Sequence, residues 1–442
     1  MKKIAALLLA LVMVLTASAA LAYSPDAPIT IKFWHNRASG ANYEALTASV
    51  ERFNTTVGAE KGIVVEETYI GGYDVLFSQT QISTQGGEQP VVAVSGNTYV
   101  AQLMDDGLLA DMAPLAAESG FDTANLIDAF LQIAGNTDGQ LHSLPYVRST
   151  PCFYYNKTMA DELGIVIPAQ PTIEDIVAAC SKAYKVADNG EVEVYGLEIF
   201  NDSGYYNAAF LWQLGEPMLS VEGDLETRTS PALDGTAMKT IMTDWHDWVQ
   251  AGWCRPFDST NASSVATEMM YQGKLFAILN SSGSMKNMIR YMNEAGLELG
   301  VANFPTYNPE NNRVEIGGGQ LVLIGKGNSD EQLKAGWEFL QFLMSDNEVY
   351  ENSIGTGYLP ITKSVASYDK MVEFWAANPT YKVPFDQLLD HGVCQEYPAF
   401  TALQEFIQSW WEVNSLLIQE NSITVDEAIQ QLKDNTAHLL AN

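Results

Sequence analysis

The chain has 442 residues, of which 54 are acidic and 23 are basic, and its formal charge at pH 7 is −31. Such a charge repels nucleic acid and anionic membranes, so the composition excludes a protein that binds either of them through a general positive field. The length exceeds what one hydrophobic core usually serves, and this predicts two domains.

The amino terminus has the pattern of an export signal. Two lysines precede an apolar run from Ile4 to Leu15, and small residues at Ala20 and Ala22 mark a cleavage site. We expect residues 1–22 to be a signal peptide that is cleaved after Ala22. No cysteine stands directly after that site to carry a lipid, and no later segment has about 18 uninterrupted apolar residues. The mature chain is therefore expected to be a soluble protein of the periplasm.

The first hundred residues alternate strand and helix patterns. Runs of β-branched and aromatic residues predict strands at 29–35, 62–70 and 90–97, and apolar residues at helical spacing predict helices at 43–53 and 73–82. This alternation predicts a parallel α/β sheet, in which ligands bind beyond the carboxyl ends of the strands. Those ends are Trp34-His35-Asn36, the turn Gly71-Gly72-Tyr73, and Gly96-Asn97.

The rest of the chain continues the alternation less regularly and closes in helices. Further strands are expected at 140–149, 151–156, 274–284, 297–303 and 317–326, and further helices at 171–184, 331–344, 402–417 and 425–440. The sequence has no repeat and no long linker. Two domains without a linker predict that the chain crosses between them more than once.

Catalytic and metal-binding patterns are scarce. The five histidines form no HExxH motif, and the four cysteines (Cys152, Cys180, Cys254, Cys394) have no zinc-site spacing. No cofactor or metal is expected, and one disulfide, two, or none are compatible with the sequence. The alternative is a secreted carbohydrate-active enzyme with paired carboxylates. The adjacent acidic pairs at 105–106 and 161–162 fall in predicted helices, where a solvated face explains them better.

Five short loops combine glycine, hydroxyl and aromatic residues, and such groups hold small hydroxylated ligands. They are GGY (71–73), RSTP (148–151), SSGS (281–284), GGG (317–319) and GTGY (355–358). The same chain resembles the family 1 extracellular solute-binding proteins of ABC importers. The resemblance runs, in order, through KFWH, the Gly72-Tyr73 turn, STPCFYYNK, SSGSMKNM, IGGGQLVLI and TGYLPITK.

This resemblance implies an α/β fold of two lobes, with hinge crossings between the lobes and a helical carboxy-terminal region. Lobe one would comprise 23–149 and 321–352, and lobe two 150–320 and 353–442. The lobes would close on a sugar, a polyol, or a sugar or glycerol phosphate. A monomeric, non-enzymatic protein would then deliver this ligand to an ABC permease in the inner membrane.

Carried over residue by residue, the resemblance marks as ligand contacts Tyr73 on lobe one, Ser149, and Ser284, Gly318 and Tyr358 on lobe two. TGYLPITK would hold Tyr358 at the cleft just after a hinge crossing. Asn97 stands where the family has an acidic contact, and Thr401 stands near the place of a family arginine. Arg148 either replaces the missing positive charge or pairs with a surface carboxylate. With the family's arginine absent, we favour a neutral carbohydrate over a phosphate ester.

Overall fold

The computed structural model describes residues 23–131, 136, 139–199, 203–220, 228–256, 262–394 and 400–440. The expected signal peptide lies outside these ranges. Within them, every helix is too short or too polar to cross a bilayer. The same ranges hold no group of three or more histidine, cysteine or acidic side chains placed to bind a metal ion.

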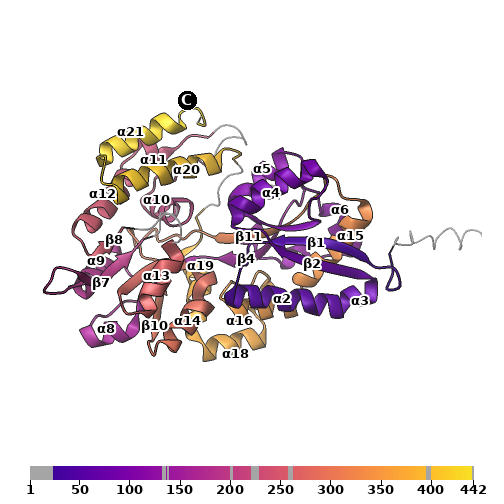
Figure 1. The fold of residues 1–442 in the computed structure, drawn as a ribbon, viewed down its shortest axis with the longest axis horizontal. Coiled ribbons are helices and arrows are strands. Elements are labelled where there is room, and N and C mark those ends of the chain that lie inside the picture. Colours follow the sequence, from indigo (N-terminus) through magenta and orange to yellow (C-terminus); the bar gives the residue numbers. More distant parts are fainter. Residues whose placement is uncertain are drawn as a thin grey trace, which may run out of the picture.

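The chain folds into two α/β lobes that lie side by side (Figure 1). Lobe one is built on a five-stranded sheet in the order β2-β1-β3-β11-β4. Strand β1 pairs in parallel with β2 and β3, whereas β11 pairs antiparallel with β3 and β4. Its strands are β1 (Ile29–His35), β2 (Ile63–Tyr69), β3 (Val92–Gly96), β4 (Leu144–Ser149) and β11 (Gly317–Leu323).

Helices cover this sheet and continue after β11. They are α2 (Gly40–Thr55), α3 (Val57–Lys61), α4 (Tyr73–Gly86), α5 (Asn97–Asp105), α6 (Ala113–Ser119), η1 (Thr123–Asn125), α7 (Asp128–Leu131), α15 (Asp330–Leu343), α16 (Asp346–Thr356), α17 (Lys363–Ala366) and α18 (Asp369–Ala377). Alternation along β1 buries Phe33, which meets Phe339 of α15 edge-on at 5.2 Å between ring centres. Phe53 of α2 meets the same ring at 5.0 Å, so α2 and α15 share one face of the sheet.

Lobe two is built on a mixed sheet in the order β10-β5-β9-β7-β6, with β8 beside β7. Strand β5 runs antiparallel to both β9 and β10, and β7 runs parallel to β9. Its strands are β5 (Pro151–Asn156), β6 (Lys185–Val186), β7 (Val192–Glu198), β8 (Cys254–Arg255), β9 (Leu275–Ser281) and β10 (Leu299–Asn303). Strand β9 is buried along nearly its whole length, as expected for an apolar strand covered on both faces.

The helices of lobe two include the carboxy-terminal ones. They are α8 (Lys157–Leu163), α9 (Ile173–Ala183), η2 (Ser203–Asn207), α10 (Ala208–Gln213), α11 (Pro231–Asp234), α12 (Ala237–Gln250), α13 (Ala262–Tyr271), η3 (Ser282–Ser284), α14 (Met285–Glu294), η4 (Pro379–Lys382), α19 (Val383–His391), α20 (Leu403–Asn414), η5 (Ser415–Gln419) and α21 (Val425–Thr436). Trp410 of α20 is fully buried in the lobe-two core. The expected helical carboxy terminus therefore completes this lobe.

The chain passes between the lobes at Thr150, which separates β4 from β5, within residues 304–316, and around α19. The expected two-lobed α/β fold with hinge crossings is confirmed. Two of the expected lobe boundaries differ from the boundaries that strand pairing and core packing define. Strand β11 pairs with strands of lobe one from Gly317 onward. The buried apolar residues between Tyr358 and Trp375 belong to the lobe-one core. Lobe one therefore extends past residue 352, because α16, α17 and α18 pack onto it.

All four cysteines are buried, and none is bonded to another. Of the three possibilities that the sequence left open, the structure shows the one without a disulfide. The thiol of Cys152 lies in the lobe-two core, where burial raises its pKa. Export permits a disulfide, but these cysteines serve as small apolar core residues.

Candidate ligand-binding site between the lobes

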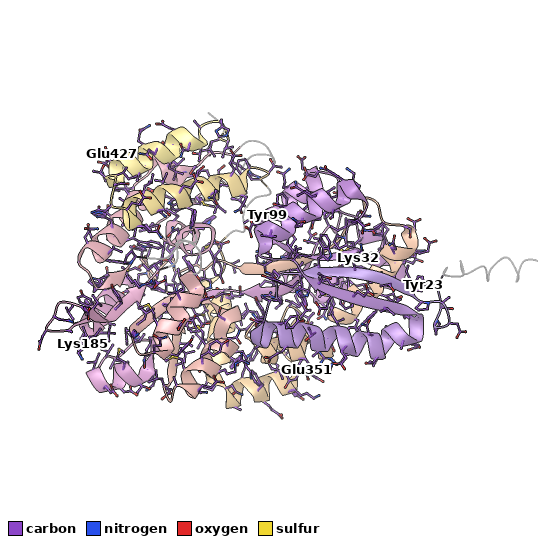
Figure 2. The ribbon with its side chains drawn as sticks, in the orientation of Figure 1. Tyr23, Lys32, Tyr99, Lys185, Glu351 and Glu427 are labelled. Carbon is purple, nitrogen blue, oxygen red and sulfur yellow. The ribbon has the colours of Figure 1, made fainter. Side chains whose placement is uncertain are left out.

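A cavity of about 690 Å³ lies between the two lobes. Lobe one lines it with strand ends and the starts of helices, and lobe two lines it with the η2 segment, the end of β9 and one face of α20. Figure 2 shows Tyr99 on the side of lobe one that faces lobe two, whereas Lys32 and Tyr23 lie toward the other end of the same lobe. The volume suits a small ligand that both lobes contact.

The lobe-one wall forms where its parallel strands end. Arg37 follows β1, Tyr73 opens α4 after β2, and Gly96 joins β3 to α5, and all three line the cavity. The Tyr73 ring lies directly over Gly96, where a β-carbon would sit 3.0 Å from its Cγ. This wall lies at the strand ends that the sequence analysis named, beyond which α/β sheets bind ligands.

The segment GTGYLPITK holds Tyr358 at the cavity from lobe one. Gly357 ends α16 with φ +109°, a conformation that favours glycine. The amide of Leu359 then donates to the carbonyl of Arg148 at 2.8 Å, which fastens the segment to β4. The expectation that Tyr358 belongs to lobe two and follows a hinge crossing is therefore corrected, because the segment packs in the lobe-one core between α16 and α17.

Arg37 is the basic residue of this cavity. Its side chain packs against Tyr358: Nη1 donates to the phenol oxygen at 2.5 Å, and the guanidinium carbon lies 4.7 Å from the ring centre. Arg37 is only 9 % exposed, and its Nη2 is buried without a hydrogen-bond partner. Burial opposes the charged form, but Tyr358, Tyr73 and Tyr146 raise the pKa of Arg37, and the net shift is upward. The guanidinium is therefore charged at neutral pH.

His35 fixes the backbone that carries Arg37. Its Nδ1 accepts a hydrogen bond from the Arg37 amide at 3.1 Å, and its Nε2 lies 2.5 Å from a carboxylate oxygen of Glu67. Because Nδ1 accepts, the proton of the neutral ring sits on Nε2 and is donated to Glu67. Complete burial of the ring lowers the pKa of His35, against the opposing pull of Glu67.

The phenols around the cavity are hydrogen-bonding groups rather than charges. Burial raises the pKa of Tyr358 and raises that of Tyr99 to about 12. Both keep their protons at neutral pH, and both line the cavity. Tyrosine rings combine an apolar face with one polar tip, which suits a ligand that presents C–H faces and hydroxyl edges.

Gly318 lets β11 run close to β4 at the cavity floor. Its φ is +104°, and a β-carbon would lie 1.8 Å from the carbonyl oxygen of Val147. The strand pairing shifts register immediately afterwards, between Gly319 and Gln320. Because β11 belongs to the lobe-one sheet, the expected placement of Gly318 on lobe two is also corrected.

The structure gives Arg148 a position that neither expectation described. Its side chain is fully buried inside lobe one, where Nη1 donates to Oδ1 of Asn97 at 2.5 Å and the guanidinium lies over Phe130. It is not one of the described residues that line the cavity. Asn97 does line it, but its Nδ2 also donates to the carbonyl of Ile316 at 3.2 Å. Asn97 therefore joins Arg148 to the hinge segment.

The remaining expected contacts separate into those at the cavity and those behind it. Ser149 lines the cavity, with its hydroxyl 3.2 Å from that of Tyr205 on lobe two. Ser284 instead lines a neighbouring cavity and donates to Asn280 at 3.3 Å, and Asn280 faces the main cavity. Thr401 precedes α20, and side chains farther along that helix reach the cavity in its place.

Sequence reasoning missed several cavity residues. Arg37 stands one position beyond the strand end that was singled out, so extending the strand-end rule by one residue would have found it. Gln404 and Gln408, which come from α20, were also missed. No sequence signal marked the two glutamines, because a polar helix face reads as solvent-exposed until a second lobe covers it.

Comparisons with known proteins agree with this architecture. A family model described as bacterial extracellular solute-binding protein matches residues 48–383. The sn-glycerol-3-phosphate-binding periplasmic protein UgpB of Brucella melitensis is 22 % identical over 372 residues, covering 81 % of each chain. UgpB of Escherichia coli O1:K1 is 25 % identical over 394 residues, covering 84 % of this chain and 83 % of that one.

Solved structures resemble the fold over most of its length. UgpB from Mycobacterium tuberculosis, in complex with glycerophosphocholine, has a TM-score of 0.78 at 20 % identity, covering 93 % of this chain and 98 % of that one. Maltose-bound MalE3 of T. maritima has a TM-score of 0.75 at 17 % identity, covering 93 % and 100 %. The TM-scores establish a shared fold, and the family model matches more than half of the sequence. The chain belongs to the family of bacterial extracellular solute-binding proteins.

Proposed function

We propose that this protein is the substrate-binding component of an ABC importer and captures a small hydroxylated ligand in the cavity between its lobes. The observation that carries the proposal is the convergence of Tyr73, Ser149 and Tyr358 from lobe one with Tyr205 and Asn280 from lobe two around one cavity. Groups from both lobes would contact the same ligand, which therefore favours the closed arrangement. The relatives named for sn-glycerol 3-phosphate and the maltose-bound neighbour support a sugar, a polyol or a phosphate ester.

The ligand contacts that we propose are the predicted residues that line the cavity: Tyr73, Asn97, Ser149, Gly318 and Tyr358. Three aromatic and hydroxyl groups among them suit a sugar or polyol without any catalytic group. We place Ser284 behind Asn280 and Arg148 behind Asn97, where each orients a cavity side chain.

The rival function, a secreted carbohydrate-active enzyme, needs two carboxylates that flank the scissile bond. Asp74 is the single carboxylate among the described residues that line the cavity. The Asp74 oxygen also folds back toward Gly72, at the start of α4, where a carboxylate stabilises the helix. The composition of the cavity therefore favours binding over hydrolysis.

A thermal-shift screen of polyols, sugars and their phosphate esters tests the proposal. A ligand at about 100 times its dissociation constant adds about 2.7 kcal/mol to the free energy of unfolding. We expect at least one compound to raise the melting temperature and to be recovered unchanged. Recovery of hydrolysed glycan, with a rate that depends on carboxylate ionisation, would establish the enzyme instead.

We further propose that the protein acts as a monomer in the periplasm after cleavage between Ala22 and Tyr23. The small residues Ala20 and Ala22 support this cleavage site. The intact mass of exported protein should begin at Tyr23 and carry no lipid, and light scattering should give the mass of one chain. A mass that retains Met1, or a dimer in solution, would refute the corresponding part.

A further inference from the structure

Arg37 has the charge, burial and unused donor of a group that recognises an anion. Its side chain is about nine-tenths buried and lines the cavity, while Nη1 is held by Tyr358. The Nη2 donor is buried and has no partner. A buried donor left without a partner costs about 1–3 kcal/mol, and more when it belongs to a charged group. A ligand oxygen at the cavity would remove this cost.

The start of α5 supplies a second, independent source of positive potential. Gly96 caps this nine-residue helix without a side-chain hydrogen bond, and its first turn contains no acidic residue. The first N–H groups of such a helix lack intrahelical partners and carry part of the helix dipole. Residues 96–99 line the same cavity as Arg37.

The neighbouring helix α4 differs from α5 in this respect. Asp74 lies in the first turn of α4 and complements the dipole at that helix start. The uncompensated helix start is therefore the one at Gly96. Tyr73 connects the two cationic features, because its ring covers Gly96 and its phenol lies near enough to Arg37 to affect the pKa of the guanidinium.

The overall charge of the protein makes this local feature decisive. With 54 acidic and 23 basic residues, the chain repels anions on average. Arg37 is the only basic residue among the described residues that line the cavity. A neutral sugar has no need of a guanidinium that keeps one donor unused, whereas an acidic ligand needs such a group to overcome the surrounding field.

We propose that Arg37 and the amino terminus of α5 form a subsite for an acidic group of the ligand, a phosphate ester or a carboxylate. This inference rests on the proposed function, and it identifies the ligand as an acidic derivative of a sugar or polyol. Tyr358 holds the guanidinium in position, and the tyrosine rings contact the rest of the ligand. Arg37 thereby takes the place that the sequence comparison had offered to Arg148.

Matched pairs of acidic and neutral compounds test the subsite by calorimetric titration. The pairs are sn-glycerol 3-phosphate with glycerol, glucose 1-phosphate with glucose, and glucuronate with glucose, and maltose serves as a larger neutral probe. We expect at least one acidic member to bind ten times more tightly than its neutral parent. The phosphate and glucuronate arms distinguish the two acidic groups.

The variant Arg37→Gln should weaken the bound acidic probe by about ten- to a hundredfold, as expected for the loss of a charge-assisted hydrogen bond. It should weaken the neutral parent much less than the acidic probe, because only the acidic group contacts the guanidinium. Arg37→Lys, which keeps the charge but not the planar fork, should fall between wild type and Arg37→Gln. The control Lys61→Gln removes one positive charge from a surface pair with Glu338 on lobe one, and should change neither affinity.

A salt titration of the wild-type protein keeps the test independent of variant folding. Affinity for the acidic probe should change as sodium chloride rises from 20 to 500 mM, because salt screens both the guanidinium and the acidic surface, whereas affinity for a neutral probe should not change. Equal affinity for acidic and neutral members, or an acidic probe unaffected by Arg37→Gln, would overturn the subsite. Tight binding of maltose alone would overturn the subsite and leave the proposed function intact. Failure of every acidic and neutral compound would overturn both.

Discussion

The guanidinium of Arg37 lies against the ring of Tyr358 and donates a hydrogen bond to its hydroxyl, although 321 positions separate the two residues in the chain. Tyr358 was marked by the sequence, and Arg37 was not. Their contact links the end of β1 to the segment that follows α16 and fixes both side chains at the cavity.

The single variants Arg37→Met and Tyr358→Phe should each lower the free energy of unfolding, because each removes one partner of a buried charged hydrogen bond. The double variant should cost less than the sum of the two. A hydrogen bond to a charged group contributes about 1.5–3 kcal/mol, so a coupling energy of this order is expected in urea unfolding. Additive effects within about 0.5 kcal/mol would show that the contact is energetically unimportant.

Gly318 should tolerate no side chain. A β-carbon there would meet the Val147 carbonyl at 1.8 Å, and φ is +104°. We expect Gly318→Ala to lower the free energy of unfolding by at least about 1–3 kcal/mol, the usual cost of such a backbone conformation. Gly86→Ala is the matched control, because no atom lies within 4 Å of its β-carbon position. Similar melting temperatures for the two variants would contradict the prediction.

His35 should make stability depend on pH. Burial lowers its pKa below the ordinary value of 6.5, so the unfolded chain binds the proton more readily than the folded one. The contribution of His35 is complete above pH 6.5 and is lost as the pH falls toward the lowered folded-state pKa. One such group changes stability by at most about 1.4 kcal/mol per pH unit.

The measurement is urea unfolding of wild type and His35→Gln at pH 7.5 and pH 5.5. The wild type should lose more stability between these values than the variant, because glutamine does not titrate. An identical pH dependence in the two proteins would refute the role given to His35.

Asn287 should help to hold the lobes together. Its Oδ1 on α14 of lobe two accepts from the Ala41 amide on α2 of lobe one at 3.0 Å. Asn287→Ala removes this bond, whose typical net value is about 0.5–1.5 kcal/mol, and should shift the population toward the open arrangement. The radius of gyration of the ligand-free protein should rise, and ligand affinity should fall by the same population factor.

Asn54→Ala serves as the control for this experiment. Asn54 exchanges two hydrogen bonds with the Val65 backbone inside lobe one, so its loss affects stability without crossing between lobes. It should leave the scattering profile unchanged. A ligand-bound profile identical to the ligand-free profile in wild type would count against closure itself.

The cysteines should be unreactive in the folded protein. All four are buried, and burial raises the pKa of Cys180 and Cys394, which suppresses the nucleophilic thiolate. A maleimide reagent should label none of the four in native protein and all four in urea without reductant. Fewer than four labels in urea would reveal a disulfide.

The sequence by itself determined the elements and the class of fold. The strand predicted at 29–35 has the bounds of β1, and the one predicted at 151–156 has those of β5. Helix positions such as 331–344 agree with α15 within one residue. These predictions succeed because alternating or helical spacing of apolar residues is a local property, set by how each element buries one face.

Only the tertiary structure decided which lobe each late segment joins and which side chains meet at the cavity. The order of β11 between β3 and β4 places Gly318 on lobe one, and the packing of α16 does the same for Tyr358. Arg148 lies near the end of β4, and Arg37 follows the end of β1. Nevertheless Arg148 is buried over Phe130, whereas Arg37 lines the cavity. Pairing between distant strands depends on the sum of many weak contacts across the whole chain, and no short stretch of sequence contains that sum.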